Sequence, residues 1–237
     1  MQILVIYPNC ENIMQVLIVS ATFLEIKNVI TDLKFNKISD NLYHVNFENK
    51  SIDILITGIG IAFTVYSLTK TLSKKQYNLV INTGIAGSLS GKLKIGDLVQ
   101  VTSEEFADLG IRSENSFSTL FEMGFIDKNT YPFSDTKLKN NSSQNLLTTD
   151  IQKVKGITVN TVNGNKNEIE NIKNKFNADI ESMEGAAFFY VCLMEKVPFI
   201  EIRAISNYVE ERNKENWDIP LAINNLTTII KKILAGI

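Results

Sequence analysis

Short apolar runs alternate with amphipathic stretches along most of this 237-residue chain. Apolar runs bounded by turn residues predict buried strands, and they occupy residues 16–19, 42–47, 52–56, 79–82, 97–102, 157–162, 178–181 and 199–204. Apolar residues with helical spacing predict helices at about 22–33, 61–72, 167–176, 185–195 and 219–234. Strands that alternate with helices are typical of an α/β protein with a mainly parallel sheet covered on both faces.

Two parts of the chain depart from this alternation. The strands at 42–47 and 52–56 are joined by Glu48-Asn49-Lys50, which predicts a hairpin. Residues 103–150 are polar and poorly periodic, with a short helix expected at 118–123. Because this segment is too long for a simple connection, it is typical of a lid, a binding loop or a disordered region.

The first residues contain a near repeat. Residues 1–6 and 14–19 read MQILVI and MQVLIV, and each run is typical of a buried strand. The second run leads directly into a predicted helix, so we expect one folded domain over 14–237. We expect residues 1–13 to be an extension, an edge strand or a product of start-site choice, and we assign no function to them.

Composition excludes several classes of protein. The formal charge is −2 and acidic and basic residues are mixed, so the basic stripe of a nucleic-acid-binding protein is missing from the sequence. No apolar run reaches the length of a membrane span, and no basic-then-apolar leader is present. We therefore expect a cytoplasmic protein without a membrane or nucleic-acid partner.

Histidine and cysteine offer little chemistry. Cys10 and Cys192 form neither a metal-ligand spacing nor a disulfide framework. The single histidine, His44, lies in an alternating strand, where we expect a structural role. We expect no metal and no cofactor, so proton transfer would fall to carboxylates, amides or water.

Polar residues follow several predicted strands. Glu25 lies in the first turn of its helix, where it either complements the helix dipole or faces a ligand. Gly58 and Gly60 form either a tight turn or a place where the backbone approaches a ligand. Phe63 breaks the G-x-G-x-x-G spacing, so these glycines are not evidence of a dinucleotide site. We expect the small residues 82–88 to form a loop that can wrap a ring or a sugar.

Two polar tips at strand ends are the most informative candidates. Ser182-Met183-Glu184 stands where a strand passes into a helix, and Arg203–Asn207 ends the next strand. Because the carboxyl ends of parallel strands meet at one edge of a sheet, the tips predict one site for a polar small molecule. Helix capping is the alternative explanation for each tip, and it weakens because all these loops fall at the same edge.

In their order along the chain, these motifs resemble the nucleoside phosphorylase and nucleosidase superfamily. The matching stretches are Glu25, Gly58-Ile59-Gly60, residues 82–87, Met183-Glu184-Gly185 and residues 203–207. The resemblance covers nearly the whole chain from Met14 onward. It implies a single-domain three-layer α/β/α fold with a mixed, mainly parallel sheet, a nucleoside substrate and a homodimer or higher oligomer. The helix at 61–72 is the expected interface element.

The resemblance also implies a role for each motif. Glu25 would act as the general base on the attacking water, and Glu184 would hold the ribose hydroxyls beside Met183. Asn207 would bind the O6/N7 edge of the base, with the N7 proton arriving through water. Further substrate contacts are expected from Ala86, Gly87, Phe106 and Val162.

Position 207 departs from one branch of the superfamily. The methylthioadenosine/adenosylhomocysteine nucleosidases have Asp where this chain has Asn207. An Asp accepts from the adenine amino group, whereas an Asn amide can donate to the O6 of a 6-oxopurine and accept from a protonated N7. Asn207 therefore predicts hypoxanthine as the base.

Residues 107–117 and 207–220 resemble the futalosine hydrolase family. That family removes hypoxanthine from futalosine in a route to menaquinone. Segment 103–135 is then expected to meet the 5′ carboxyphenyl extension. Arg112 and Arg212 are candidates for its carboxylate, and an exposed surface position is the alternative for each.

Residues 20–26 argue for hydrolysis. They contain no Arg, Lys or Gly, whereas the phosphorylases of the superfamily need a basic, Gly-rich anion site there. Glu25 would also repel phosphate. The rival functions are a methylthioadenosine/adenosylhomocysteine nucleosidase, a purine nucleoside phosphorylase and a non-enzymatic nucleoside-binding protein.

Overall fold

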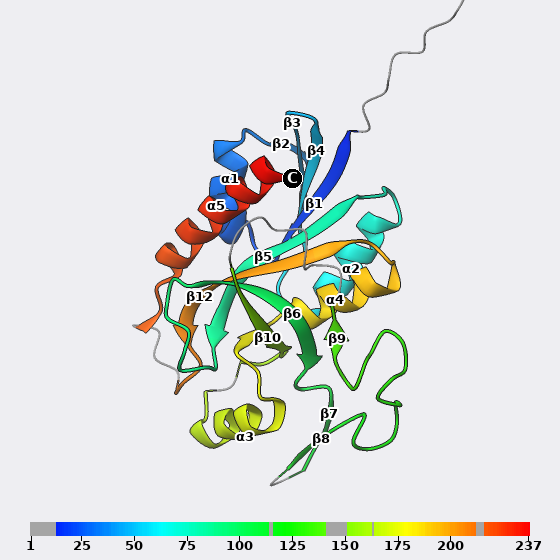
Figure 1. Ribbon diagram of the computed structural model, residues 1–237, viewed down its shortest axis with the longest axis vertical. Coiled ribbons are helices and arrows are strands. Elements are labelled where there is room, and N and C mark those ends of the chain that lie inside the picture. The colour runs from blue at the N-terminus through cyan, green and yellow to red at the C-terminus, as the bar shows by residue number, and fades with distance from the viewer. Residues whose placement is uncertain (1–12, 114–115, 141–150, 163, 212–215) are drawn as a thin grey trace, which may run out of the picture.

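The computed structural model describes residues 13–113, 116–140, 151–162, 164–211 and 216–237 (Figure 1). Arg212 and, apart from Ile13, the predicted extension lie outside this part of the chain. The strands are β1 Met14–Ser20, β2 Asn36–Ser39, β3 Leu42–Phe47, β4 Lys50–Ile56, β5 Leu79–Ser88, β6 Leu98–Phe106, β7 Gly110–Arg112, β8 Phe117–Thr119, β9 Leu138–Lys139, β10 Gln152–Thr158, β11 Ile180–Ser182 and β12 Phe199–Tyr208. The helices are α1 Phe23–Asp32, α2 Ile61–Leu72, α3 Lys166–Phe176, α4 Gly185–Met194 and α5 Ile219–Gly236.

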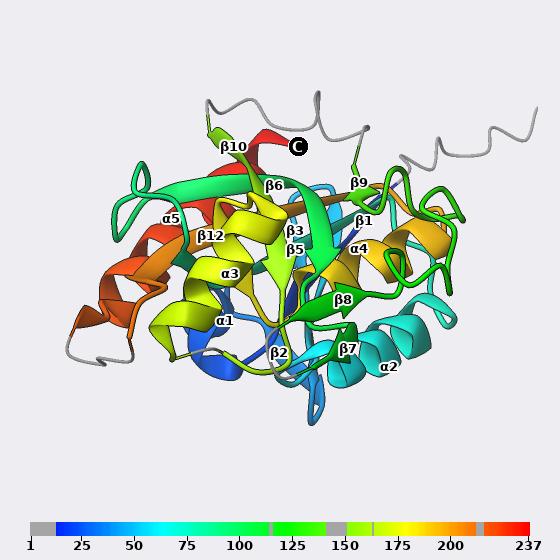
Figure 2. The same cartoon turned by 90° about the horizontal axis from the view of Figure 1, so that it is seen from below.

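One mixed sheet forms the middle layer. Its strand order is β11-β10-β6-β12-β5-β1-β4-β3-β2, and β4, β1, β5 and β12 run parallel. Figure 2 shows α1 and α5 on one side of the sheet and α2 and α4 on the other. The predicted three-layer α/β fold with a mixed sheet is confirmed.

Each face of the sheet has its own apolar core. Ile26 and Val29 of α1 pack with Leu226 and Ile230 of α5 against one face. The other face holds α4, whose Phe188 and Phe189 stack edge-on against Phe199, with the Phe189 and Phe199 ring centroids 4.8 Å apart. Because α4 is apolar almost all round, it can form only where protein covers it on several sides.

The short strand β11 closes part of the sheet on itself. It pairs in parallel with β10 and antiparallel with β5, so β5, β12, β6, β10 and β11 form a ring. In this ring Gly87 of β5 lies opposite Glu181 of β11 on one side and opposite Asn207 of β12 on the other. The closure therefore brings three distant parts of the sequence to one point.

Several predicted boundaries were wrong. Residues 83–88 and 205–208, expected as loops, continue β5 and β12, because the two strands stay paired with each other there and β11 pairs with the end of β5. The helix expected at 118–123 does not form. Phe117–Thr119 is strand β8, and the Glu122 carboxylate accepts from the Thr119 N–H at 2.8 Å, which closes a turn instead. The edge strand β2 is exposed along its length and holds a single apolar residue, Ile38, so no apolar pattern predicted it.

Among the described residues, no helix is long and apolar enough to cross a membrane.

Candidate active site

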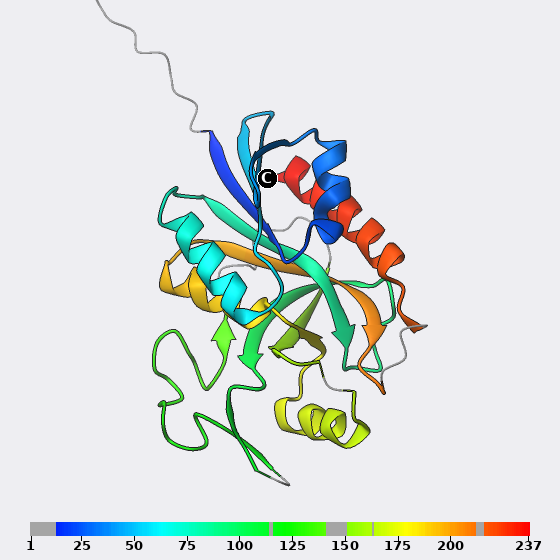
Figure 3. The same cartoon turned by 180° about the vertical axis from the view of Figure 1, so that it is seen from behind.

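A cavity of about 600 Å³ opens where β5, β11 and β12 end. Figure 3 shows β5 and β12 running side by side to this edge. Seven of the eight predicted site residues line the cavity: Glu25, Ala86, Gly87, Val162, Met183, Glu184 and Asn207. Concave sites with a few converging polar groups are typical of ligand-binding sites, so the structure brings the predicted constellation together.

Two predicted contacts lie elsewhere. Phe106, at the end of β6, packs against the apolar core beneath α4 and is not among the residues that line the cavity. Arg112 is exposed on β7, where its Nη1 lies 3.6 Å from Glu168 Oε1 and its guanidinium lies over the Phe117 ring. Neither side chain reaches the cavity in this arrangement.

Glu25 is buried and uses both carboxylate oxygens. Its Oε2 accepts from the Thr22 N–H at 3.0 Å and from the Thr22 hydroxyl at 2.7 Å, which caps α1. Its Oε1 accepts from the Ile85 N–H of β5 at 3.1 Å. A carboxylate offers about four acceptor positions, so one remains for a water in the cavity. The capping and ligand-facing interpretations of Glu25 are therefore compatible.

Glu184 stands at the start of α4. Its Oε1 accepts from the Gly60 N–H at 3.0 Å, and its Oε2 lies 3.7 Å from Arg203 Nη1. Gly60 adopts a φ of 97°, which L side chains rarely adopt. The backbone N–H of Gly60 thus fixes the position of the Glu184 carboxylate at the cavity. Burial raises the pKa of Glu184, and the positive charge of Arg203 partly opposes this rise.

Arg203 of β12 is a positioning residue, and sequence analysis placed it in a polar tip without giving it a role. Its side chain is fully buried, and its Nε donates to Glu201 Oε1 at 2.8 Å. A Cβ on Gly84 would lie 2.4 Å from Arg203 Nη1 and 2.9 Å from Glu25 Oε1. The guanidinium therefore lies beneath the cavity floor between the two carboxylates, in space that Gly84 leaves open. Glu201 and Arg203 stand two positions apart in an otherwise apolar strand and so share one face of it. This spacing could have indicated a buried ion pair.

Asn207 presents its amide to the cavity with a defined orientation. Its Oδ1 accepts from the Ser206 hydroxyl at 2.8 Å, and its Nδ2 donates to the Tyr208 carbonyl at 3.0 Å. An amide oxygen has two lone pairs and its nitrogen has two N–H groups. One acceptor and one donor position thus remain for a ligand.

Glu181 of β11 is a further acid at the cavity. It is 5% exposed, and its Oε2 has no hydrogen-bond partner among the described residues. Burial, and then the charge of Asp108, raises the pKa of the Glu181 carboxyl to about 7. Sequence analysis placed Glu181 at the end of a predicted strand, in the acidic stretch that leads to Glu184, but gave it no role.

This pKa predicts a pH-dependent stability. The carboxyl of Glu181 binds its proton more tightly in the folded than in the unfolded chain, so its contribution is complete below about pH 4.5 and is lost as the pH rises through about 7. Glu181→Gln removes this titration. We expect the variant to gain up to about 3 kcal/mol of unfolding free energy over the wild type between pH 4 and pH 8. Urea denaturation across this range measures the gain, and a difference that does not change with pH would contradict it.

The lining of the cavity also limits its chemistry. None of the described residues that line it is Lys or Arg, so phosphate would find no direct cationic partner there. Within the described residues, no cluster of His, Cys, Asp and Glu could hold a metal ion. The polar groups of the cavity are thus carboxylates, amides, hydroxyls and backbone groups.

Comparison with known proteins adds sequence and structural relatives. Residues 15–235 match the model of the phosphorylase superfamily. A futalosine hydrolase of Acidothermus cellulolyticus is 33% identical over 177 residues, which cover 73% of this chain and 71% of that protein. A 5′-methylthioadenosine/S-adenosylhomocysteine nucleosidase of Buchnera aphidicola is 29% identical over 225 residues, 90% of this chain and 92% of that protein.

A solved structure shares the fold. The futalosine hydrolase of Helicobacter pylori superposes with a TM-score of 0.79 at 20% identity, covering 95% of this chain and 99% of that chain. At this identity the likeness supports the fold alone. Futalosine hydrolases and methylthioadenosine/adenosylhomocysteine nucleosidases match at similar identity, so overall similarity does not distinguish hypoxanthine from adenine as the base.

Proposed function

The chain belongs to the phosphorylase superfamily of nucleoside-cleaving enzymes, and from this premise we propose that it hydrolyses futalosine to hypoxanthine and dehypoxanthine futalosine, in a route to menaquinone. The observation that carries the proposal is the amide of Asn207 at the same cavity as the carboxylates of Glu25 and Glu184. No metal or cofactor is part of the proposed reaction.

Two charges develop in the transition state, and the carboxylates suit the positive one. Breaking an N-glycosidic bond places positive charge on the ribose and negative charge on the base, and the enzyme must stabilise both. Glu25 orients a water with its remaining acceptor position and takes its proton as the water attacks C1′. Glu184 accepts from the ribose hydroxyls, and Met183 packs beside the sugar. N7 takes a proton from a second water, the base leaves as hypoxanthine, and the proton on Glu25 returns to the hydroxide that this water leaves behind.

The amide of Asn207 favours a 6-oxopurine. Its free N–H donates to O6, and the free lone pair of Oδ1 accepts from a protonated N7. The bond to Tyr208 opposes rotation of the amide, because a flip would place Oδ1 against the Tyr208 carbonyl, and two acceptors would then face each other. A methylthioadenosine nucleosidase is the second candidate, favoured by the longer match to the Buchnera aphidicola relative.

Hydrolysis rather than phosphorolysis is tested in phosphate-free buffer. We expect purified protein to release hypoxanthine from futalosine at the same rate with and without added phosphate, because water is the nucleophile. Chromatography of the free base and of the sugar product measures this. Release that begins only when phosphate is added, with a ribose 1-phosphate product, would contradict the proposal.

We also propose a homodimer. Helix α2 carries Phe63 and Tyr66, which are 62% and 66% exposed, and Ile59 precedes it at 53%. Large apolar side chains gathered on one exposed face are typical of an interface.

A further inference from the structure

Glu181 is the acid at the cavity to which the proposed mechanism gives no task. It is buried, its Oε2 has no partner among the described residues, and it lines the same cavity as Asn207. Burying a carboxylate oxygen without a hydrogen bond destabilises the folded state of the free protein. Such a group at a cavity wall is suited to a ligand that supplies the missing donor.

The ring of strands places Glu181 across from Asn207. Both residues lie opposite Gly87, one on β11 and the other on β12. Residues directly opposite in a sheet point to the same face, and adjacent strands lie about 4.8 Å apart. The two side chains therefore flank the floor at Gly87 from backbones about 10 Å apart. A Cβ at Gly87 would lie 2.7 Å from Val209 Cγ2 and 3.2 Å from Asn207 Nδ2, so only glycine fits between these two side chains.

We propose that Glu181 accepts a hydrogen bond from the N1–H of the 6-oxopurine, so that Asn207 and Glu181 bind opposite edges of one base. This inference rests on the proposed function, because it assigns a residue to the base of that same substrate. Glu181 is a specificity-determining residue in this scheme, and the proton for N7 still comes from water.

The chemistry of the base makes the contact selective. Hypoxanthine carries a hydrogen on N1, whereas the N1 of adenine has only a lone pair. An ionised carboxylate can only accept hydrogen bonds. It therefore accepts from the N1–H of hypoxanthine and repels the N1 lone pair of adenine. Asp108, whose Oδ1 and Oδ2 accept from Asn160, is the charged group that raises the pKa of Glu181 in the free site. A donated hydrogen bond from N1–H favours the ionised form of Glu181.

Calorimetric binding of hypoxanthine and 1-methylhypoxanthine at pH 8 tests the contact. The methyl group removes the N1–H, so we expect the wild type to bind hypoxanthine about 30-fold more tightly, within the range of a hydrogen bond to a charged group. In Glu181→Ala we expect a preference below about 3-fold. Glu170→Ala removes an exposed carboxylate of α3 outside the cavity and should keep the wild-type preference.

Glu181→Gln guards against a variant that fails to fold. It keeps the size of the side chain and gains an N–H that can donate to the N1 of adenine. We therefore expect the affinity for adenine relative to hypoxanthine to rise about tenfold. A wild-type preference for hypoxanthine that persists in Glu181→Ala, or an unchanged adenine-to-hypoxanthine ratio in Glu181→Gln, would overturn the inference.

Binding of free bases requires no turnover, so the two proposals can fail separately. Loss of discrimination in Glu181→Ala without any hydrolysis of futalosine would leave this contact standing and refute the proposed function. If the protein hydrolyses futalosine but Glu181→Ala still prefers hypoxanthine to 1-methylhypoxanthine, the proposed function stands and the Glu181 contact is refuted. A wild type that binds no hypoxanthine overturns the contact directly.

Discussion

Glu25→Gln should lower the turnover of futalosine by about 10³-fold, because removing a general base typically costs 10²- to 10⁴-fold. An amide cannot take the proton of the attacking water. Its Nε2 would also face a donor in either orientation, since Oε1 and Oε2 of Glu25 both accept from backbone N–H groups. The loss should appear in kcat more than in KM, measured by chromatography of released hypoxanthine.

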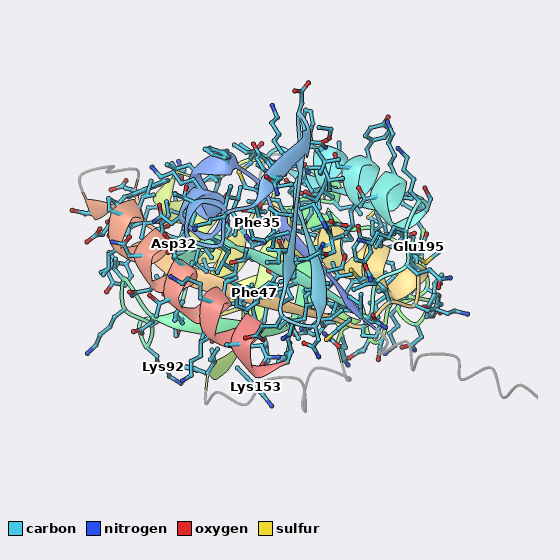
Figure 4. All side chains as sticks on the ribbon, turned by 90° about the horizontal axis from the view of Figure 1, so that it is seen from above. Asp32, Phe35, Phe47, Lys92, Lys153 and Glu195 are labelled. Carbon is cyan, nitrogen blue, oxygen red and sulfur yellow. The ribbon has the colours of Figure 1, made fainter. Side chains whose placement is uncertain are left out.

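Asp32→Asn is the matched control for Glu25→Gln. Asp32 lies on the same helix but faces α5 at the surface, where Lys231 Nζ lies 2.7 Å from its Oδ2 (Figure 4). Exposed ion pairs contribute at most about 1 kcal/mol, so this variant should fold and turn over substrate at nearly the wild-type rate. If Glu25→Gln retained more than about a tenth of the wild-type kcat, Glu25 would not be the base.

Asn207→Asp should shift the enzyme from hypoxanthine toward adenine. A carboxylate oxygen would then stand about 3 Å from the Tyr208 carbonyl that Nδ2 now contacts, and its charge would oppose the O6 of a 6-oxopurine. We expect kcat/KM for futalosine to fall about a hundredfold, the effect of two opposed acceptors in a buried site. Cleavage of methylthioadenosine should rise, because a carboxylate accepts from the adenine amino group.

Asn224→Asp makes the same chemical change on the exposed surface of α5 and should leave both activities unchanged. The decisive quantity is the ratio of kcat/KM for the two nucleosides in each variant. If Asn207→Asp lowered the cleavage of futalosine and of methylthioadenosine by the same factor, position 207 would support the fold without recognising the base.

Local pattern predicted the helices because their apolar spacing is complete within each segment. The bounds of α2 came out as predicted, and those of α1, α3, α4 and α5 to within two residues. The ends of β5 and β12 were not predictable in the same way. Residues 83–88 are mostly small, and they form a strand because β12 pairs along them and β11 pairs with the last two.

The same distinction applies to the site. The meeting of Glu25, Glu184 and Asn207 at one cavity could be predicted because each lies at or just beyond the end of a strand, and parallel strands share an edge. The roles of Arg203 and Glu181 depend on contacts that local sequence does not contain. Arg203 needs the space at Gly84, and Glu181 meets Gly87 through a pairing that closes the ring of strands. Phe106 was misplaced because an aromatic residue at a strand end can face either the core or a cavity.

Direct competition between two nucleosides tests the central claim most simply. The purified protein is given equimolar futalosine and methylthioadenosine in phosphate-free buffer, and early release of hypoxanthine and adenine is followed by chromatography. The ratio of the two initial rates equals the ratio of kcat/KM. We predict that hypoxanthine exceeds adenine by at least about tenfold, the discrimination that one well-formed hydrogen bond provides. Adenine in excess, or no free base of either kind, would contradict the account.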